Sequence, residues 1–481
     1  MTTIKLDPGA ALLLDALHGA GHAAYVVGGC VRDSLLGLDP HDWDLCTSAR
    51  PEQVMALFGE EKCIPTGLQH GTVTVKQGGR LYETTTFRTE GAYSDGRHPD
   101  AVCFVPDVRE DLARRDFTIN AMAYSAEEGL IDPFGGRDDL AAHLVRAVGE
   151  PERRFEEDAL RILRLYRFAA RFGFAIDPAT GAAARVLGPH LDCVSAERIQ
   201  EELLKLLAAP RPGSYLEPAV LAVILPELEP EKQPERFAEL CRTIDRIEPT
   251  AENVPARLAA LLRPLGEAGA RKALRKLKCS NALTDEVTAL VGGSVGSFLL
   301  GHEFELRHPA DALCLERHSH PAGRCPNSNS LFPPQAAVVA VAGHSIARPI
   351  ACGSRVPPQR TVLGETPGTP NTTLTVQAKR LLGRYELPTI QRLTALCSAR
   401  YPEQAEAFAA LRAEAERLTA ENACCRVSQL AVNGHDLMAA GVRPGPGLRQ
   451  VLNALLEVVI TGQTPNEKDA LLAAAAQFSA S

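Results

Sequence analysis

The stretch AAYVVGGCVRDSLLGLDPHDWDLCT, residues 23–47, decides the fold that the sequence predicts. Its apolar start predicts a buried strand over residues 23–27 that ends in a Gly28-Gly29 turn, and a short helix follows over residues 30–38. Backbone N–H groups at a strand–glycine–helix junction can bind a phosphate. Neither the P-loop spacing nor the dinucleotide-binding spacing is present, so the turn alone does not identify a ligand.

Two aspartates mark the next predicted strand, residues 42–47. Side chains two apart on a strand point to the same face, so Asp42 and Asp44 would form a carboxylate pair, while Trp43 would face the core. Two carboxylates held close together repel each other unless a cation lies between them, and Mg²⁺ accepts a few carboxylates together with substrate phosphates. A solvated pair of aspartates in a turn is the alternative interpretation.

A further acid lies in a third predicted strand. Residues 82–87, YETTTF, are rich in β-branched and aromatic residues, and Glu83 is their only acid. If this strand pairs beside the first two, Glu83 completes a three-carboxylate site for two metal ions. Such a site can activate a hydroxyl group and stabilise a leaving pyrophosphate.

The composition is that of an ordinary globular protein of several units. The chain has 481 residues, 45% of them hydrophobic and 23% charged, and its length predicts three or four units. No apolar run reaches the roughly 20 residues that span a bilayer, and no cleavage-site pattern follows the N-terminal apolar patch, so we expect a cytoplasmic protein with no membrane partner. The net charge of −8 does not by itself indicate a nucleic-acid binder, so any such contact must come from local basic patches.

The segment RRFEEDALRILRLYRFAARFGF, residues 153–174, contains six arginines and apolar residues at helical spacing. Asp158, Arg161, Arg164 and Arg167 recur every third residue, which predicts a stripe along one side of a helix. A salt-bridged, solvated helix face is the alternative. Because few acids accompany these arginines in the segment, we expect them to bind an anion such as a triphosphate.

Six motifs resemble the class II CCA-adding enzyme and bacterial poly(A) polymerase family. In chain order they are GGCVRD (28–33), DWD (42–44), RRDFTINA (114–121), DPFGGRDDL (132–140), EDALRILR (157–164) and ERIQEEL (197–203). The resemblance implies an α+β fold, in which a nucleotidyltransferase head with a small mixed sheet precedes all-α neck, body and tail domains. It also implies that Gly29 and Arg32 touch the nucleotide's phosphates, and that Arg115 and Asp116 lie near the triphosphate and ribose.

Asp158 and Arg161 are expected to read the base. An ionised aspartate only accepts hydrogen bonds and an arginine only donates them. Cytosine and adenine both present an amino donor beside a ring acceptor and match this pair, whereas guanine and uracil present a carbonyl beside a ring N–H. Two unpaired polar groups at about 1–3 kcal/mol each would disfavour the wrong bases by on the order of 100-fold or more.

The activity expected from the resemblance is addition of CCA to the 3′ end of tRNA, with CTP and ATP as substrates, Mg²⁺ as cofactor and pyrophosphate as product. The stretch PTGLQHGTVTV, residues 65–75, lacks the basic run of the poly(A) polymerases, and the loop 88–102 is typical of members that complete the CCA end. An enzyme adding only CC or only A, or a catalytically impaired RNA-binding relative, is the alternative. The oligomeric state is left open.

The expected domains are the head (1–147), neck (148–210), body (211–291) and tail (372–481). Residues 292–371, rich in Pro, Ser, His and Asn, match nothing in the family and are expected to be a disordered insertion or the product of a frame anomaly. A zinc site built from Cys314, His318, His320 and Cys325 is a weak alternative, because the spacing matches no standard finger.

Three further expectations concern the helical part of the chain. The basic positions of residues 271–278, RKALRKLK, either contact a tRNA backbone or form a solvated face. A helix opening at residues 444–447, PGPG, would carry on one face Leu448, Val451, Leu452, Leu455, Leu456 and Val459, and its first amides could meet an RNA phosphate. No His-Asp metal pair is visible in the body, so no phosphohydrolase activity is expected.

Overall fold

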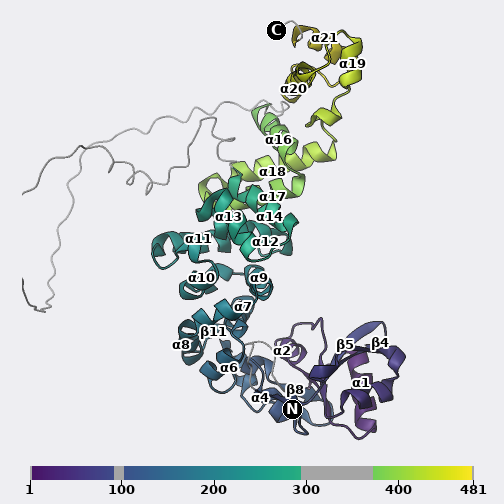
Figure 1. The fold of residues 1–481 in the computed structure, drawn as a ribbon, viewed down its shortest axis with the longest axis vertical. Coiled ribbons are helices and arrows are strands. Elements are labelled where there is room, and N and C mark those ends of the chain that lie inside the picture. Colours follow the sequence, from purple (N-terminus) through teal and green to yellow (C-terminus); the bar gives the residue numbers. More distant parts are fainter. Residues whose placement is uncertain (1–2, 92–101, 294–371, 479–481) are drawn as a thin grey trace, which may run out of the picture.

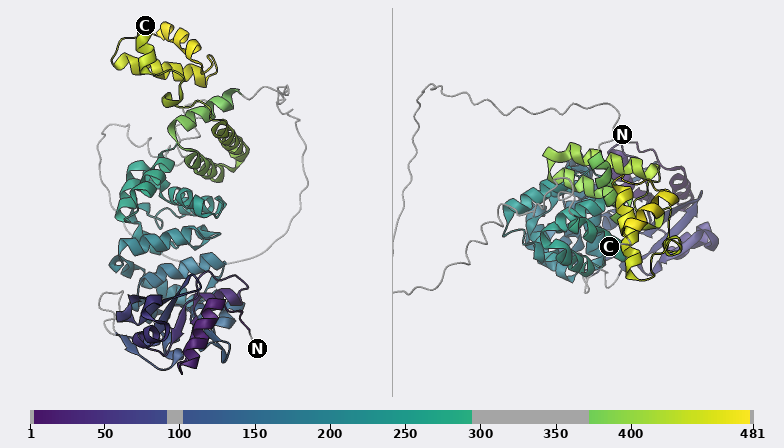
Figure 2. Two further views of the ribbon diagram at one scale, coloured as in Figure 1. Left: turned by 90° about the vertical axis from the view of Figure 1, so that its right-hand side faces the viewer. Right: turned by 90° about the horizontal axis from the view of Figure 1, so that it is seen from above.

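The computed structural model describes residues 3–91, 102–293 and 372–478. These residues form an elongated molecule with a β-sheet at the N-terminal end and successive layers of helices toward the C-terminal end (Figures 1 and 2). The α+β fold expected from the sequence is therefore confirmed. The loop residues 92–101 and the stretch 294–371, with its cysteines and histidines, lie outside the described residues.

A mixed seven-stranded sheet forms the centre of the head. In spatial order its strands are β3 (Cys63–Gly67), β4 (Thr72–Gln77), β5 (Arg80–Thr86), β2 (Leu45–Thr47), β1 (Ala24–Val27), β8 (Ala123–Ser125) and β9 (Gly129–Ile131). Strands β2 and β5 pair in parallel, and the other neighbours are antiparallel. The parallel pair places the start of β2 beside the middle of β5.

Strand β1 is covered on both faces, as its continuous apolar run predicts. Ala24 and Val26 belong to one hydrophobic cluster and Tyr25 and Val27 to another, in the period-two alternation of a strand. Helices α1 (Pro8–Gly19) and α3 (Pro51–Phe58) contact the sheet through β1 and β4 respectively. The strand then leads directly into α2 (Gly29–Leu35), the short helix that the sequence predicts.

The strand predicted over residues 42–47 is shorter than expected. Strand β2 begins at Leu45, so Asp42 and Asp44 lie in the extended segment before it. The main chain of Asp44 still joins the sheet, because the Val27 N–H donates to its carbonyl oxygen at 2.9 Å. Trp43 is buried in the core, as predicted.

Helices make up most of the remainder. They are α6 (Pro151–Glu157), α7 (Leu160–Phe172), α8 (Pro178–Val186), α9 (Ala196–Leu207), α10 (Pro218–Ile224), α11 (Pro234–Arg246), α12 (Val254–Leu262), α13 (Gly266–Lys276), α14 (Asn281–Gly292), α16 (Thr372–Arg384), α17 (Leu387–Arg400) and α18 (Ala405–Ala420). One continuous hydrophobic cluster runs from Ile4 to Cys425 and links the head to α18. Among the described helices none is long and apolar enough to cross a membrane.

A buried arginine joins the ends of two of these helices. The guanidinium of Arg257, on α12, is fully buried and donates to the carbonyl oxygens of Leu207, the last residue of α9, of Ala209 just beyond it, and of Ile247 after α11. The last carbonyls of a helix lack partners within the helix and carry a partial negative charge, so a cation is well placed there. Arg257 therefore ties the α9 end to the α11 end through main-chain acceptors.

The C-terminal end divides into two parts. Helix α17 packs on α11, α12 and α14, whereas α19 (Gly434–Ala439), α20 (Pro446–Ile460) and α21 (Lys468–Phe478) share a separate core. Helix α20 begins within the PGPG sequence, as predicted. Val451, Leu455 and Val459 are buried on one face of this helix.

Candidate active site

The glycine turn supports an arginine side chain. Gly28 has a φ of 77° and caps α2, and a Cβ atom at this position would lie 2.9 Å from Nη1 of Arg115. A side chain here would be strained by the backbone and would also displace the guanidinium. Gly29 has more space, because a Cβ atom there would be 3.6 Å from Nη2 of Arg32. The turn therefore brings two of the expected phosphate-binding arginines to the start of α2.

The expected acids gather where β2 begins. Leu45 pairs with Thr84 in the parallel ladder, so the residues directly before them, Asp44 and Glu83, extend the same register. Asp42, Asp44 and Glu83 are all exposed. In the described part of the chain, none of the three carboxylates has a hydrogen bond or an ion pair. The pairing of β5 beside β2, on which the Glu83 prediction depended, is present, and the catalytic role of Glu83 stays a prediction.

The carboxyl group of Asp44 is held in an unfavourable environment. Its pKa is raised to about 6, first because surrounding protein atoms displace water and then because the Glu83 and Asp42 carboxylates repel its charge, while Arg115 opposes the rise. The side chain nevertheless remains accessible to solvent. A carboxylate that is crowded by protein and by like charge, yet accessible and without a partner, is suited to a cation from solution.

The acids do not form a closed metal cage. Over the described ranges, no three His, Cys, Asp or Glu side chains converge closely enough to hold a metal ion on their own. The three-carboxylate site therefore stays a prediction. The oxygen donors still fit Mg²⁺, which is commonly bound by one or two carboxylates together with water and substrate phosphates.

A buried aspartate fixes Arg115. Asp111, on α4 (Val108–Ala113), is fully buried and receives Arg115 at 3.3 Å and Arg114 at 2.9 Å. Burial alone would raise the pKa of Asp111, but the two guanidinium groups outweigh it and the pKa is lowered. Arg114 and Arg115 are therefore not an exposed basic pair, because both side chains are anchored on Asp111.

A second network links α2 to α7. Arg32 is buried and donates to Asp33 at 2.8 Å and to the Asn120 side-chain oxygen at 2.5 Å. Asn120 donates in turn to Asp116, which also accepts two hydrogen bonds from Arg164, at 2.9 and 2.6 Å. Burial would raise the pKa of Asp116, but Arg164 outweighs it and holds the pKa well below its usual range. Arg32 and Arg164 thus belong to one hydrogen-bonded unit.

The predicted stripe is not carried by one helix. Helix α6 ends at Glu157, α7 begins at Leu160, and Asp158 between them has an extended backbone, with φ −148°. The Asp158 carboxylate accepts a hydrogen bond from the Leu160 N–H at 3.1 Å, a local turn that competes with helix continuation. Asp158 is therefore separated from the helical row of Arg161, Arg164 and Arg167.

The arginines of this row have acidic partners. Arg161 bonds Glu157 at 2.8 Å, Arg164 bonds Asp116, and Arg167 lies 2.7 Å from Glu202 of α9. Few acids accompany these arginines within residues 153–174, but Asp116 and Glu202 reach them from segments distant in sequence. Burial lowers the pKa of Arg167 to about 10, with Glu202 acting in the opposite direction.

Asp158 and Arg161 keep free hydrogen-bonding capacity. Asp158 also accepts from Arg198 of α9 at 2.8 Å, so two of its roughly four lone-pair sites are used. Arg161 uses three of its N–H groups, toward Arg154, Glu157 and Arg114. Both residues could therefore still meet a base edge. Sequence reasoning missed Arg198 and Glu202, although both lie in the ERIQEEL motif.

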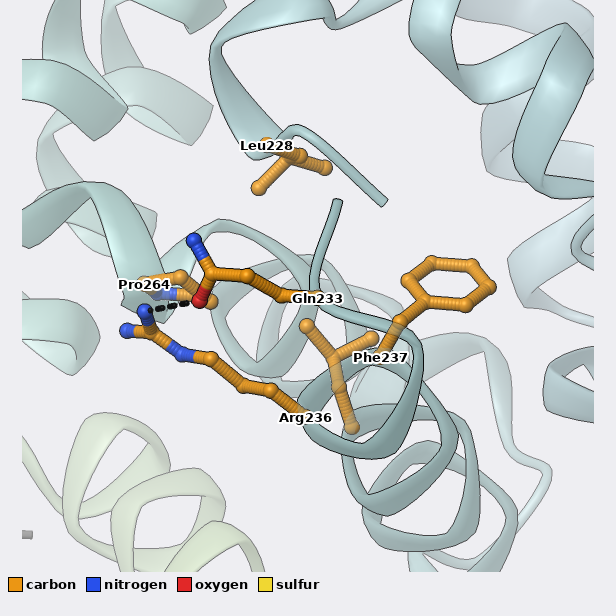
Figure 3. A pocket seen from close by; sticks show the side chains of 6 residues that line it. Leu228, Gln233, Arg236, Phe237 and Pro264 are labelled. Carbon is orange, nitrogen blue, oxygen red and sulfur yellow. Dashed lines mark hydrogen bonds between the residues drawn. The ribbon is translucent and has the colours of Figure 1, made fainter. Parts of the chain in front are cut away.

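A shallow pocket elsewhere has a different character. It lies beside α11 and is lined by Leu228, Gln233, Arg236, Phe237, Leu240 and Pro264 (Figure 3). The Arg236 guanidinium donates to the Gln233 side-chain oxygen at 2.9 Å, so its main polar groups satisfy each other. The lining has no acid, and none of the residues of the candidate active site takes part.

The sheet, the glycine turn and the acids define a nucleotidyltransferase head. Residues 24–146 match the family model described as "Poly A polymerase head domain". Residues 173–232 match "Probable RNA and SrmB-binding site of polymerase A", and residues 382–475 match a model for tRNA nucleotidyltransferase domain 2. The three matches lie in the same order as the head and the helical regions of this chain.

The chain belongs to the CCA-adding enzyme family. It is 32% identical over 462 residues to a CCA-adding enzyme of Lactiplantibacillus plantarum, an alignment that covers 96% of this chain and 93% of the relative. A relative from Leuconostoc citreum is 46% identical over 242 residues, which cover 50% of this chain and 60% of that protein. The crystal structure of the Bacillus stearothermophilus CCA-adding enzyme in complex with CTP matches with a TM-score of 0.68 and 29% identity, over 98% of each chain.

Proposed function

We propose that this chain adds CCA to the 3′ end of tRNA without a nucleic-acid template, from CTP and ATP and with release of pyrophosphate. The proposal rests on the exposed acids Asp42, Asp44 and Glu83, which have no ion-pair partner among the described residues. Arg115, whose guanidinium lies against Gly28 of the glycine turn, interacts with the Asp44 carboxylate. Membership of the CCA-adding enzyme family supports the choice of reaction. A protein that only bound RNA would need no crowded carboxylates at this position.

Mg²⁺ is the proposed metal, held by Asp42 and Asp44, with Glu83 as a further catalytic carboxylate. When bound, the two ions of such a site would activate the tRNA 3′-hydroxyl and neutralise charge on the departing pyrophosphate. Asp44 has a raised pKa because it is crowded, so cation binding would relieve the repulsion from Glu83. The donor set contains only oxygens, which suits Mg²⁺.

The triphosphate is proposed to lie against the glycine turn and α7. Gly29 leaves space for close approach, and Arg115 and Arg164 keep 21% and 33% of their side chains exposed. Arg32 and Arg167 are more deeply buried, at 4% and 13%, so they would contribute mainly through charge and by exchanging partners. Guanidinium groups held in place by acids present fixed donors to an anion.

Base selection is proposed to rest on Asp158 and Arg161. Their unused acceptor and donor sites match the amino donor and ring acceptor of cytosine and adenine. Uracil and guanine would leave polar groups unpaired at the same place. The two residues lie one turn apart, since the Arg161 N–H donates to the Asp158 carbonyl at 3.0 Å.

The helical part of the chain is proposed to bind tRNA. Lys272, Arg275, Lys276 and Lys278, on and after α13, are exposed and have no ion-pair partner among the described residues. Such a row suits phosphate contacts, whereas Arg271 in the same segment is paired with Asp285 at 2.7 Å. We retain the proposed division into head (1–147), neck (148–210), body (211–291) and tail (372–481) for this purpose.

An extension assay tests the proposal. The full chain is incubated with Mg²⁺, CTP, ATP and a tRNA that ends at the discriminator base, and the 3′ ends are sequenced. Addition of C, C and A supports the proposal. Extension by C residues alone, or growth only of a tRNA ending in CC, would instead identify an enzyme of partial activity. No extension at all would favour a catalytically impaired RNA-binding relative.

A further inference from the structure

The Phe168 ring lies among three guanidinium groups. The Cζ atoms of Arg32, Arg164 and Arg167 are 5.3, 5.4 and 4.1 Å from its centroid. Phe168 is 4% exposed, so its ring is shielded from water. A cation near an aromatic ring within about 6 Å is attracted by the negative face of the ring, and the attraction grows when water is excluded.

The three arginines come from two elements and pair with three acids. Arg32 belongs to α2, whereas Arg164 and Arg167 belong to α7. Asp33 pairs with Arg32 and Asp116 with Arg164, while Glu202 pairs with Arg167 and also lies 3.8 Å from Arg164. Among the aromatic rings of the described residues, Phe168 is the only one that lies beneath all three guanidinium groups. Arg32 also lies over the Phe172 ring, 4.9 Å from its centroid.

We propose that Phe168 is a positioning residue for the triphosphate: its ring holds Arg32, Arg164 and Arg167 in the arrangement that binds the nucleotide's phosphates. This inference rests on the proposed function, because it assumes that the three arginines meet a nucleotide. The acids accept hydrogen bonds or ion pairs from the N–H groups of the three guanidinium groups. The Phe168 ring contacts the guanidinium groups themselves and fixes the positions of the three arginines relative to one another. Loss of the ring would leave the acids in place and remove the one aromatic contact that all three guanidinium groups share.

Phe117 provides a matched control. It is fully buried and meets Phe168 edge to face, with centroids 5.8 Å apart. Across the described ranges no guanidinium lies over the Phe117 ring. Phe117→Leu and Phe168→Leu therefore remove similar buried aromatic volume from neighbouring positions, and only the second removes the ring that the arginines contact. If Phe168 only supported the fold, Phe117→Leu and Phe168→Leu would weaken anion binding to a similar extent.

The experiment compares wild type, Phe168→Leu, Phe168→Tyr and Phe117→Leu as full-length proteins. Calorimetry with inorganic tripolyphosphate and Mg²⁺ measures anion binding without catalysis, and steady-state kinetics measures KM and kcat for CTP and ATP. We expect Phe168→Leu to weaken tripolyphosphate binding and raise both KM values about tenfold, with a much smaller change in kcat. Phe168→Tyr keeps an aromatic face and should bind within about threefold of wild type.

Phe117→Leu should bind tripolyphosphate within about twofold of wild type while its melting temperature falls as much as that of Phe168→Leu. Equal binding by Phe168→Leu and wild type, or equal loss in both leucine variants, would overturn the inference. Phe168→Met, which fills most of the volume without a ring, replaces the leucine variant if the latter does not fold. Wild-type protein that bound neither CTP nor tripolyphosphate would instead overturn the proposed function itself.

Discussion

Asp44 and Glu83 each stand one residue before a pair, Leu45 and Thr84, in the parallel ladder of β2 and β5. The two carboxylates are thereby held close enough for Glu83 to raise the pKa of Asp44, although burial is the larger cause. The pairing of β2 with β5 fixes the main-chain positions of Asp44 and Glu83, so side-chain rotation relieves the repulsion between the two carboxylates only in part. A divalent cation is the natural partner for the pair.

Asp44→Asn should abolish nucleotide transfer while leaving the fold intact. Metal ions in such sites contribute several kcal/mol to stabilising the developing charge, so we expect kcat to fall by about 10³-fold or more. The measurement is single-turnover incorporation of CMP at saturating CTP and Mg²⁺. Asp39→Asn is the control, because Asp39 is exposed in the same loop and has no ion-pair partner among the described residues. A kcat for Asp44→Asn within tenfold of wild type would contradict the metal role.

The same substitution should stabilise the metal-free protein at neutral pH. The folded-state pKa of Asp44, about 6, lies above the ordinary aspartate value of 3.8, so folding favours the protonated form. The contribution of Asp44 to the free energy of unfolding is therefore most favourable below pH 4, and it is lost as the pH rises through 6. In EDTA, Asp44→Asn should melt about 2 °C or more above wild type at pH 8.

The difference in melting temperature between Asp44→Asn and wild type should shrink as the pH is lowered and vanish near pH 4. Melting curves recorded with EDTA at pH 4, 6 and 8 supply the measurement. Although protein atoms crowd the Asp44 carboxylate, its side chain is exposed, and water screens an accessible charge, which limits the size of the effect. A difference that grew toward low pH would show that the pKa is lowered rather than raised.

Local spacing predicts the parts of the site that depend on local geometry. The glycine turn and the inward-facing Trp43 follow from a strand and its ends, and the structure bears them out. Asp42 and Asp44 are exposed, but they lie before the strand on which they were predicted. The strand predicted over residues 42–47 begins three residues too early. In the structure, the extended segment before Leu45 makes one main-chain hydrogen bond to β1, which is too few for it to continue the strand. A pattern of alternating residues does not show where strand pairing stops.

The partners of the arginines could not be predicted in the same way. Arg164 and Arg167 have no acid within a helical turn that pairs with them, and their partners Asp116 and Glu202 come from a loop of the head and from α9. The sequence of residues 153–174 therefore shows an excess of positive charge that the fold removes. Only the tertiary structure distinguishes a free cationic stripe from one whose charges are already paired.

Arg257→Met should destabilise the protein without touching the site. Its removal leaves buried carbonyl oxygens of Leu207, Ala209 and Ile247 without their donor, at about 1–3 kcal/mol for an unsatisfied group. We expect unfolding in denaturant to show a loss of roughly 3–5 kcal/mol. Arg242→Met, which breaks an exposed ion pair with Glu239, should cost less than about 1 kcal/mol. Equal losses in the two variants would show that Arg257 is not a structural link.

The central claim is that Asp158 and Arg161 select the base of the incoming nucleotide, and nucleotide selectivity tests it most directly. The measurement is the ratio of kcat/KM for CTP to that for UTP, on a tRNA that ends at the discriminator base, in wild type and in Asp158→Ala. Release of Arg198 affects both nucleotides equally, so the ratio isolates base reading. We expect the ratio to be about tenfold or more lower in Asp158→Ala than in wild type, because the substitution removes the acceptor for the cytosine amino group. An unchanged ratio would contradict it.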